Sequence, residues 1–328
     1  MPPELIVVIL LALVFDFLNG VHDSSNIVAT MIASRAFSPR SALALTAVAN
    51  FLGPFLFGVA VATTIGDEVA QSSALNIDVI IACLIGAIFW NILTWFLGIP
   101  SSSSHALIGG MVGAVIAGAG FGSIKLHGLE KVLIALFASP VIGFVFGFLL
   151  TRVVYFLARA ATPEVNWFFK KGQLITALAM AFSHGTNDAQ KTMGIITLSL
   201  VISGYITEFR VPTWVIALSA GAIGLGTALG GWRLIRTLGG KFYKIRPVHG
   251  FSTQLTSGLV ILGASFFGLP VSTSQVVSSA IIGVGSSERL GKVRWSVAQE
   301  IVAAWFITIP ASALVAAGIY WLIVFVKR

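Results

Sequence analysis

The stretch NGVHDSSN at residues 19–26 interrupts an otherwise apolar sequence, and a related stretch, HGTNDAQK, follows at residues 184–191. Each stretch carries one carboxylate beside amides and a glycine. A carboxylate inside a membrane is costly unless it binds a partner or an ion. The duplication therefore predicts one polar site assembled from two related parts of the chain.

Composition places these polar stretches in a membrane protein. Of the 328 residues, 57% are hydrophobic and 10% are charged, against roughly 25% charged in a soluble domain. The apolar runs are continuous rather than alternating, which favours helices over a β-barrel. At about 20 residues for each span, the sequence predicts an all-α polytopic protein of the cell membrane with about ten to twelve membrane segments.

The net charge of +8 comes from Lys and Arg dispersed at the ends of the apolar segments. This distribution is typical of loops beside a lipid bilayer and not of a nucleic-acid surface. The one cysteine, Cys83, allows no internal disulfide. Residues 1–4 lack the positive region of a cleavable signal, so we expect the first apolar segment to be retained as a helix.

A second pair of related motifs follows in the same order, GIPSSSSH at residues 98–105 and GLPVSTSQ at residues 268–275. The aspartates of the first pair are 165 positions apart and the prolines of the second pair are 170 apart. Two motifs in one order at nearly one separation predict an internal repeat. We place its halves at residues 1–166 and 167–328, together forming one domain.

Loop charges indicate that the two halves have opposite orientations. In the first half the connection at 35–40 is basic, while the one at 66–78 is acidic and includes Glu68. In the second half the counterpart at 203–212 is neutral and the one at 232–248 is strongly basic. Because cytoplasmic loops collect Lys and Arg, equivalent loops are expected on opposite faces. That is the pattern of an inverted repeat, whose substrate site lies near the midplane.

The apolar segments beside the first pair of motifs are short. Segments 4–18 and 24–34 flank the first motif, and segments 172–186 and 192–207 flank the second. Unpaired backbone groups are not tolerated in lipid but are tolerated beside a cavity. We therefore predict broken helices whose interruptions at the two motifs line a shared cavity.

The serine-rich motifs suggest an anion site. Proline interrupts a helix, and the hydroxyls that follow it can cap the next one. An exposed helix amino terminus binds tetrahedral oxyanions through free N–H groups. Kinking and capping without any ligand is the alternative. The predicted hydroxyl donors are Ser102, Ser103, Ser104, Ser272, Thr273 and Ser274.

The carboxylates suggest a different ligand. Asp23 and Asp188, with Asn19, Asn187 and exposed carbonyls, offer the hard oxygen ligands that a small cation prefers. Cation ligands beside anion donors favour cation-coupled anion uptake, since each ion offsets the desolvation cost of the other. Proton coupling through either aspartate is equally compatible with the residue types, and a polar clamp between helices without a ligand is the alternative.

Lys191 occupies the place in the second motif that Asn26 holds in the first. It could contact the anion, pair with Asp188, or act as an internal substitute for one cation. Pairing is the default for a buried lysine. We include both Asn26 and Lys191 among the residues expected to contact the anion.

The four motifs together resemble the signature of the inorganic phosphate transporter (Pit) family. HGTNDAQK and the pair Asp23 and Asn26 are similar to its bacterial and archaeal branch, and the serine-rich motifs to its paired hairpins. The resemblance covers essentially the whole chain. It implies inorganic phosphate as substrate, sodium or proton symport, two inverted repeats that each contain a re-entrant hairpin, and a homodimer. The residues alone specify only a small tetrahedral anion.

We therefore predict a secondary active transporter with no cofactor, which imports phosphate by alternating access with sodium as the favoured co-substrate. A passive anion channel for phosphate or sulfate is the main alternative. A membrane phosphatase is weaker, because no nucleophile, base and metal set is evident. The chain departs from many eukaryotic relatives at Lys191, where they have asparagine, and in its short link at 162–166, where animal members have a large hydrophilic loop. The predicted sodium ligands are Asp23, Asp188, Asn19 and Asn187.

Overall fold

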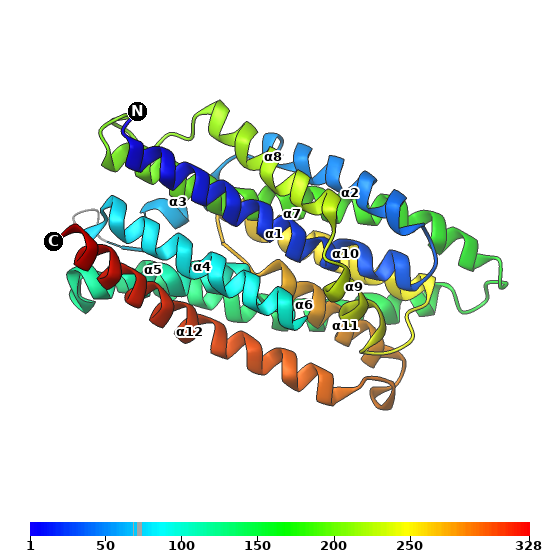
Figure 1. Ribbon diagram of the computed structural model, residues 1–328. Coiled ribbons are helices and arrows are strands. Elements are labelled where there is room, and N and C mark those ends of the chain that lie inside the picture. The colour runs from blue at the N-terminus through cyan, green and yellow to red at the C-terminus, as the bar shows by residue number, and fades with distance from the viewer. Residues whose placement is uncertain (68, 71–73) are drawn as a thin grey trace.

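The computed structural model describes residues 1–67, 69–70 and 74–328, and Glu68, whose charge entered the loop comparison, lies outside them. The described chain is all-helical, as predicted, and its helices form an elongated bundle with both termini at the same end (Figure 1). Its twelve α-helices are α1 (Pro3–Ala33), α2 (Pro39–Leu52), α3 (Ala60–Asp67), α4 (Ile77–Leu97), α5 (Ser103–Ala119), α6 (Leu126–Leu157), α7 (Val165–Ile202), α8 (Thr213–Leu229), α9 (Trp232–Gly240), α10 (Pro247–Phe266), α11 (Thr273–Glu288) and α12 (Trp295–Lys327).

The same order of helices occurs twice along the chain. A long helix (α1, then α7) precedes a bent pair (α2 with α3, then α8 with α9), which turns by 74° and 68° respectively. A helix and a shorter helix follow on either side of the Pro-Ser motif (α4 and α5, then α10 and α11). A long helix with an internal proline closes each series, at Pro140 in α6 and Pro310 in α12.

The first pair of motifs lies within uninterrupted helices. α1 continues through residues 19–26 and α7 through residues 184–191, so the predicted breaks at these motifs are wrong. A helix satisfies its backbone groups internally, and polar side chains do not require it to open. The glycines serve close helix contacts instead. A Cβ at Gly20 would lie 2.3 Å from the Ile223 carbonyl oxygen of α8.

The chain breaks at the second pair of motifs. Gly98 ends α4 and Gly268 follows α10, with φ of 70° and 65°, values that glycine adopts without steric cost. Ser102 then caps α5 by accepting from the His105 N–H at 3.1 Å. Ser272 caps α11 in the same way. The predicted capping role of these motifs is confirmed. The breaks join the helices into two hairpins, α4–α5 and α10–α11.

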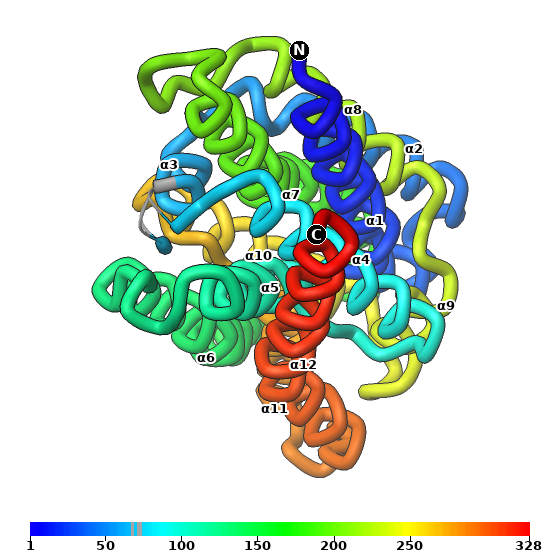
Figure 2. The backbone as a smooth tube through the Cα atoms, turned by 60° about the vertical axis from the view of Figure 1, so that its left-hand side comes forward, coloured from blue at the N-terminus to red at the C-terminus, as the bar shows by residue number. Residues whose placement is uncertain are grey.

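The two series of helices interlock. α5 packs along α12 and α11 packs along α6, so the short helix of each series lies against the closing helix of the other (Figure 2). α5 approaches α12 through a glycine face, since a Cβ at Gly109 or Gly113 would lie within 2.4 Å of a carbonyl oxygen of α12. Small residues at such crossings are typical of membrane helices.

The surface is apolar and the centre is polar. Four helices (α1, α4, α6 and α12) are long and apolar enough to cross a membrane, and the number rises to six if each bent pair counts as one span. Large apolar side chains of α6 and α12, such as Phe146 and Leu314, are exposed on the outside. α7 fails the same criterion because it carries the polar motif through the middle of the bundle.

Candidate functional site

The site lies where α1 and α7 cross between the two hairpins. The helices are antiparallel, since Ser34 at the end of α1 donates to Gln173 near the start of α7 at 3.1 Å. Every site residue predicted from the sequence is at most 3% exposed. The structure therefore holds the site closed on all sides. These residues are Asn19, Asp23, Asn26, Ser102, Ser103, Ser104, Asn187, Asp188, Lys191, Ser272, Thr273 and Ser274.

The two aspartates meet at the centre through their Oδ2 atoms. Thr273 Oγ1 lies 3.0 Å from Asp23 Oδ2 and 2.9 Å from Asp188 Oδ2. His184 Nε2 lies 3.4 Å from the first oxygen and 3.0 Å from the second. A hydroxyl has one proton to donate, so Thr273 can satisfy only one carboxylate at a time.

His184 is the central residue that the sequence did not identify. Thr227 Oγ1 donates to the Ile223 carbonyl at 2.9 Å and so accepts from Asn50 Nδ2 at 2.7 Å. The Asn50 Oδ1 atom is then the acceptor for His184 Nδ1–H at 3.0 Å. With that proton fixed, Nε2 faces two carboxylates. The contact requires a proton on Nε2, a proton on one carboxylate, or a cation between them.

The ligand atoms of Asp23, His184 and Asp188 all lie within 4.8 Å of one another. Two carboxylate oxygens and a ring nitrogen fit a small cation, and the carboxylates would be the ligands that a hard ion such as sodium prefers. The alignment of the motifs pairs His184 with Asn19, which gives no sign of this role. The bridging position depends on how α1 and α7 cross.

The outer oxygen of Asp23 is bound by hairpin α10–α11. Ser274 Oγ donates to Asp23 Oδ1 at 2.5 Å, and Asn26 Nδ2 donates to the same oxygen at 2.8 Å. Asn26 also donates to Ser274 at 2.9 Å. A carboxylate from the first helix is thus held by the hairpin of the second series.

The outer oxygen of Asp188 is bound by Lys191. The ammonium donates to Asp188 Oδ1, to Ser104 Oγ at 2.6 Å and to the Val271 carbonyl oxygen at 3.0 Å. The pairing of Lys191 with Asp188, the default expected from sequence, is confirmed. Ser104 in turn donates to the Val271 carbonyl at 3.1 Å, so the two hairpin tips are in contact beside the ammonium.

Other predicted residues lie at the edge of this centre. Ser103 donates to Asn19 Oδ1 at 2.7 Å and so ties the first hairpin to α1. Asn187 is directed elsewhere, because its amide donates to Ser265 of α10 at 2.9 Å and to the Leu269 carbonyl at 3.2 Å. Two of the hydroxyls expected to bind the anion, those of Thr273 and Ser274, donate directly to the carboxylates expected to bind the cation, so the two groups of residues are not separate here.

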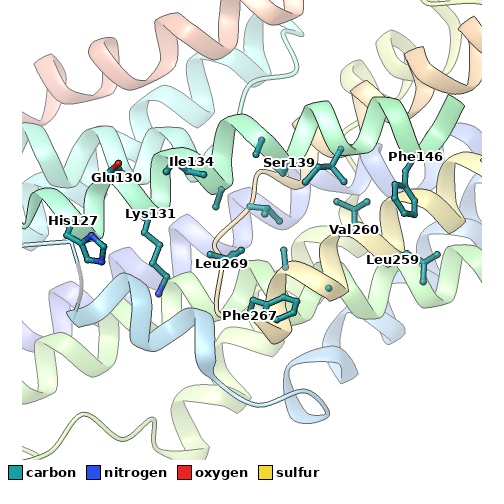
Figure 3. Close-up of a pocket in the computed structure, with 16 residues that line it drawn as sticks. His127, Glu130, Lys131, Ile134, Ser139, Phe146, Leu259, Val260, Phe267 and Leu269 are labelled. Atoms are coloured by element: carbon teal, nitrogen blue, oxygen red, sulfur yellow. The ribbon is translucent and has the colours of Figure 1, made fainter. Parts of the chain in front are cut away.

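An apolar groove of about 610 Å³ between α6 and α10 lies behind this centre (Figure 3). His127, Glu130 and Lys131 lie along α6 at one end of the groove, and Phe146 and Leu259 lie at the other. Leu269 and Val271 of the second hairpin also line it. None of the buried carboxylates lines it. The groove borders the hairpin loop whose Val271 carbonyl accepts from Lys191.

Comparison with known proteins gives consistent results. Residues 19–316 match the family described as "Phosphate transporter family". A Bacillus subtilis protein named "Probable low-affinity inorganic phosphate transporter" is 45% identical over 97% of this chain and 96% of its own length. A Rhizobium meliloti protein of the same name is 46% identical over the same shares. A solved structure titled "The sodium-dependent phosphate transporter" has a similar fold, with a TM-score of 0.89 at 23% identity over 99% of this chain and 100% of that one.

Proposed function

Since the chain belongs to the phosphate transporter family and is a multi-pass plasma-membrane protein rather than an enzyme, we propose that it imports inorganic phosphate together with sodium ions by alternating access. The observation that carries the proposal is the closed centre. Thr273 and Ser274 of the second hairpin donate to the buried carboxylates of α7 and α1, and Lys191, which pairs with Asp188, donates to Ser104 of the first hairpin. Cation ligands and anion donors thus share one site at the crossing of the two helices.

The order of binding follows from charge. The centre holds two carboxylates and one ammonium, so an incoming phosphate meets net negative charge unless a cation or a proton balances the second carboxylate first. A sodium ion at Asp23, Asp188 and the neighbouring amides would lower that repulsion and release hydroxyls from the carboxylates. Phosphate would then accept from those hydroxyls and from the first N–H groups of α5 and α11. Cation and phosphate binding should be reciprocally cooperative.

We further propose that the halves 1–166 and 167–328 are inverted repeats, each with a re-entrant hairpin. The antiparallel crossing of α1 and α7, which hold the same place in the element order, supports inversion. Movement of one series of helices against the other would open the site to each side in turn. The family resemblance also suggests a homodimer, which a mass measurement in detergent would test.

The reconstituted protein tests the coupling. In proteoliposomes with labelled phosphate, we expect accumulation against the phosphate gradient when a sodium gradient is imposed. A proton gradient is the second arm, because His184 between two carboxylates favours a proton as the alternative ion. Accumulation with the proton gradient alone would show that protons, and not sodium ions, drive uptake. Equilibration without accumulation under either gradient would indicate a passive anion channel and overturn the proposal.

Ser103→Ala tests the phosphate contacts. The Ser103 hydroxyl donates to Asn19 in the closed site, and we propose that phosphate takes its place. Loss of one hydrogen bond to a charged ligand should raise the KM for phosphate by about tenfold, with a smaller change in maximal rate. Ser101→Ala is the matched control, because the buried Ser101 hydroxyl of the same hairpin donates to Thr94 of α4 instead. An equal KM in the two variants would remove Ser103 from the phosphate site.

A further inference from the structure

Asn26 and Lys191 hold the same place in two matching arrangements of side chains. Each lies three positions after the aspartate of its own helix and donates to the Oδ1 atom of that carboxylate. Each also donates to a serine of the other series' hairpin, Asn26 to Ser274 at 2.9 Å and Lys191 to Ser104 at 2.6 Å. The two arrangements differ in charge, with a neutral amide in the first and an ammonium in the second.

The oxygen atoms around Lys191 Nζ are of the kind that a small cation binds. An ammonium has three N–H groups, and Nζ donates to three acceptors, Asp188 Oδ1, Ser104 Oγ and the Val271 carbonyl oxygen. A carboxylate, a hydroxyl and a backbone carbonyl are also hard oxygen ligands for inorganic cations. The lysine side chain is 1% exposed, so its charge is balanced inside the site and not by solvent.

We propose that Lys191 is a tethered cation. Its ammonium takes the position of one coupling ion beside Asp188, so that this chain moves one external cation fewer with each phosphate than a chain with a neutral residue there. The inference rests on the proposed cation-coupled uptake and deepens it by assigning the cation number to one residue. Asp23 is then the carboxylate whose charge an external cation must balance.

A structural ion pair without any role in coupling is the competing explanation. The first arrangement argues against it, because Asn26 makes the equivalent contacts to Asp23 and Ser274 without a charge. A neutral residue therefore satisfies the packing at the equivalent position of α1. What the lysine adds is a fixed positive charge that cannot leave the site, and it neutralises Asp188 throughout the transport cycle.

Neutral variants at this position test the inference by binding. Lys191→Asn gives the second arrangement the residue of the first, and Lys191→Gln is a second amide variant if the asparagine form does not assemble. Lys191→Met is the matched control, since its long side chain fills most of the space of the lysine and brings neither a charge nor an oxygen. The melting temperature of each detergent-solubilised protein is measured against NaCl, with choline chloride holding the ionic strength constant.

We expect the amide variants to gain a sodium site. The Hill coefficient for stabilisation by NaCl should exceed that of the wild type by about one, while Lys191→Met should gain no sodium response. In proteoliposomes, the number of cations moved with each labelled phosphate, obtained from the reversal potential, should also rise by about one in the amide variants.

The outcomes separate the two proposals. Assembled amide variants that respond to NaCl as the wild type does, or no more than Lys191→Met does, overturn the tethered cation. So does uptake by an amide variant with an unchanged number of cations for each phosphate. If the wild type shows no cation-driven uptake while the amide variants still gain a sodium site, the proposed coupling fails, and what stands is that the Lys191 ammonium occupies a cation site beside Asp188.

Discussion

Asp23→Asn is expected to reduce cation-driven phosphate uptake by about 100-fold or more, a loss of about 3 kcal/mol of transition-state stabilisation. Asp23 Oδ1 accepts from Ser274 and Asn26, and Oδ2 faces Thr273 and His184. An asparagine removes the negative charge that a cation would balance. It also turns one of these acceptors into a donor that faces other donors. Initial rates of labelled phosphate uptake under a sodium gradient measure the effect.

The control for this substitution is Glu4→Gln, which removes a carboxylate that is 62% exposed at the far end of α1 and far from the crossing. Its uptake should equal that of the wild type. Size-exclusion chromatography establishes that each variant is assembled. An assembled Asp23→Asn protein with wild-type kinetics would contradict the assignment of Asp23 to the coupling ion.

Gly113→Val is expected to destabilise the bundle by about 3 kcal/mol or more, or to prevent its assembly. A Cβ at Gly113 would lie 2.1 Å from the Ala313 carbonyl oxygen, a backbone atom of α12 that cannot turn aside. α5 would have to move away from α12, and the serines at its start would move with it. The melting temperature in detergent and the fraction of monodisperse protein report the loss.

Gly318→Val provides the comparison for the glycine face. It places the same side chain in α12 at a position where a Cβ would meet nothing within 4 Å. Its effect should be limited to helix propensity, which favours valine over glycine by less than about 1 kcal/mol, so no loss of stability is expected. A Gly113→Val protein as stable as the Gly318→Val protein would show that α5 and α12 can separate without harm.

The sequence predicts most of the site because most of the site residues lie in short motifs. Lys191 lies three positions after Asp188, a spacing that places both on one face of a helix, and the predicted pairing follows. The Gly-x-Pro and serine pattern predicts a helix stop followed by a capped start, which Gly98 and Ser102 provide. These features depend on neighbours along the chain, and a single sequence contains them.

The features that the sequence does not predict depend on contacts between distant helices. A polar stretch inside a helix looks like an interruption when only apolar runs are counted, so these runs predict breaks within α1 and α7 that the structure does not contain. His184 reaches Asp23 only because α1 and α7 cross at that depth. Asn187 turns toward α10 because Ser265 lies there. The spacing of residues within a motif does not specify which way the His184 and Asn187 side chains point.

The interlocked packing of α5 on α12 also constrains how the protein is made. Ala119 ends α5 and Trp295 begins α12, so 176 positions separate the two surfaces. At 5 to 20 residues per second, the ribosome needs roughly 10 to 35 s to synthesise that interval. During this time α12 has not been synthesised, so the glycine face of α5 cannot pack against it. The first half therefore cannot reach its final arrangement before the last helix enters the bilayer, and maturation of the ion site is a late event in biosynthesis.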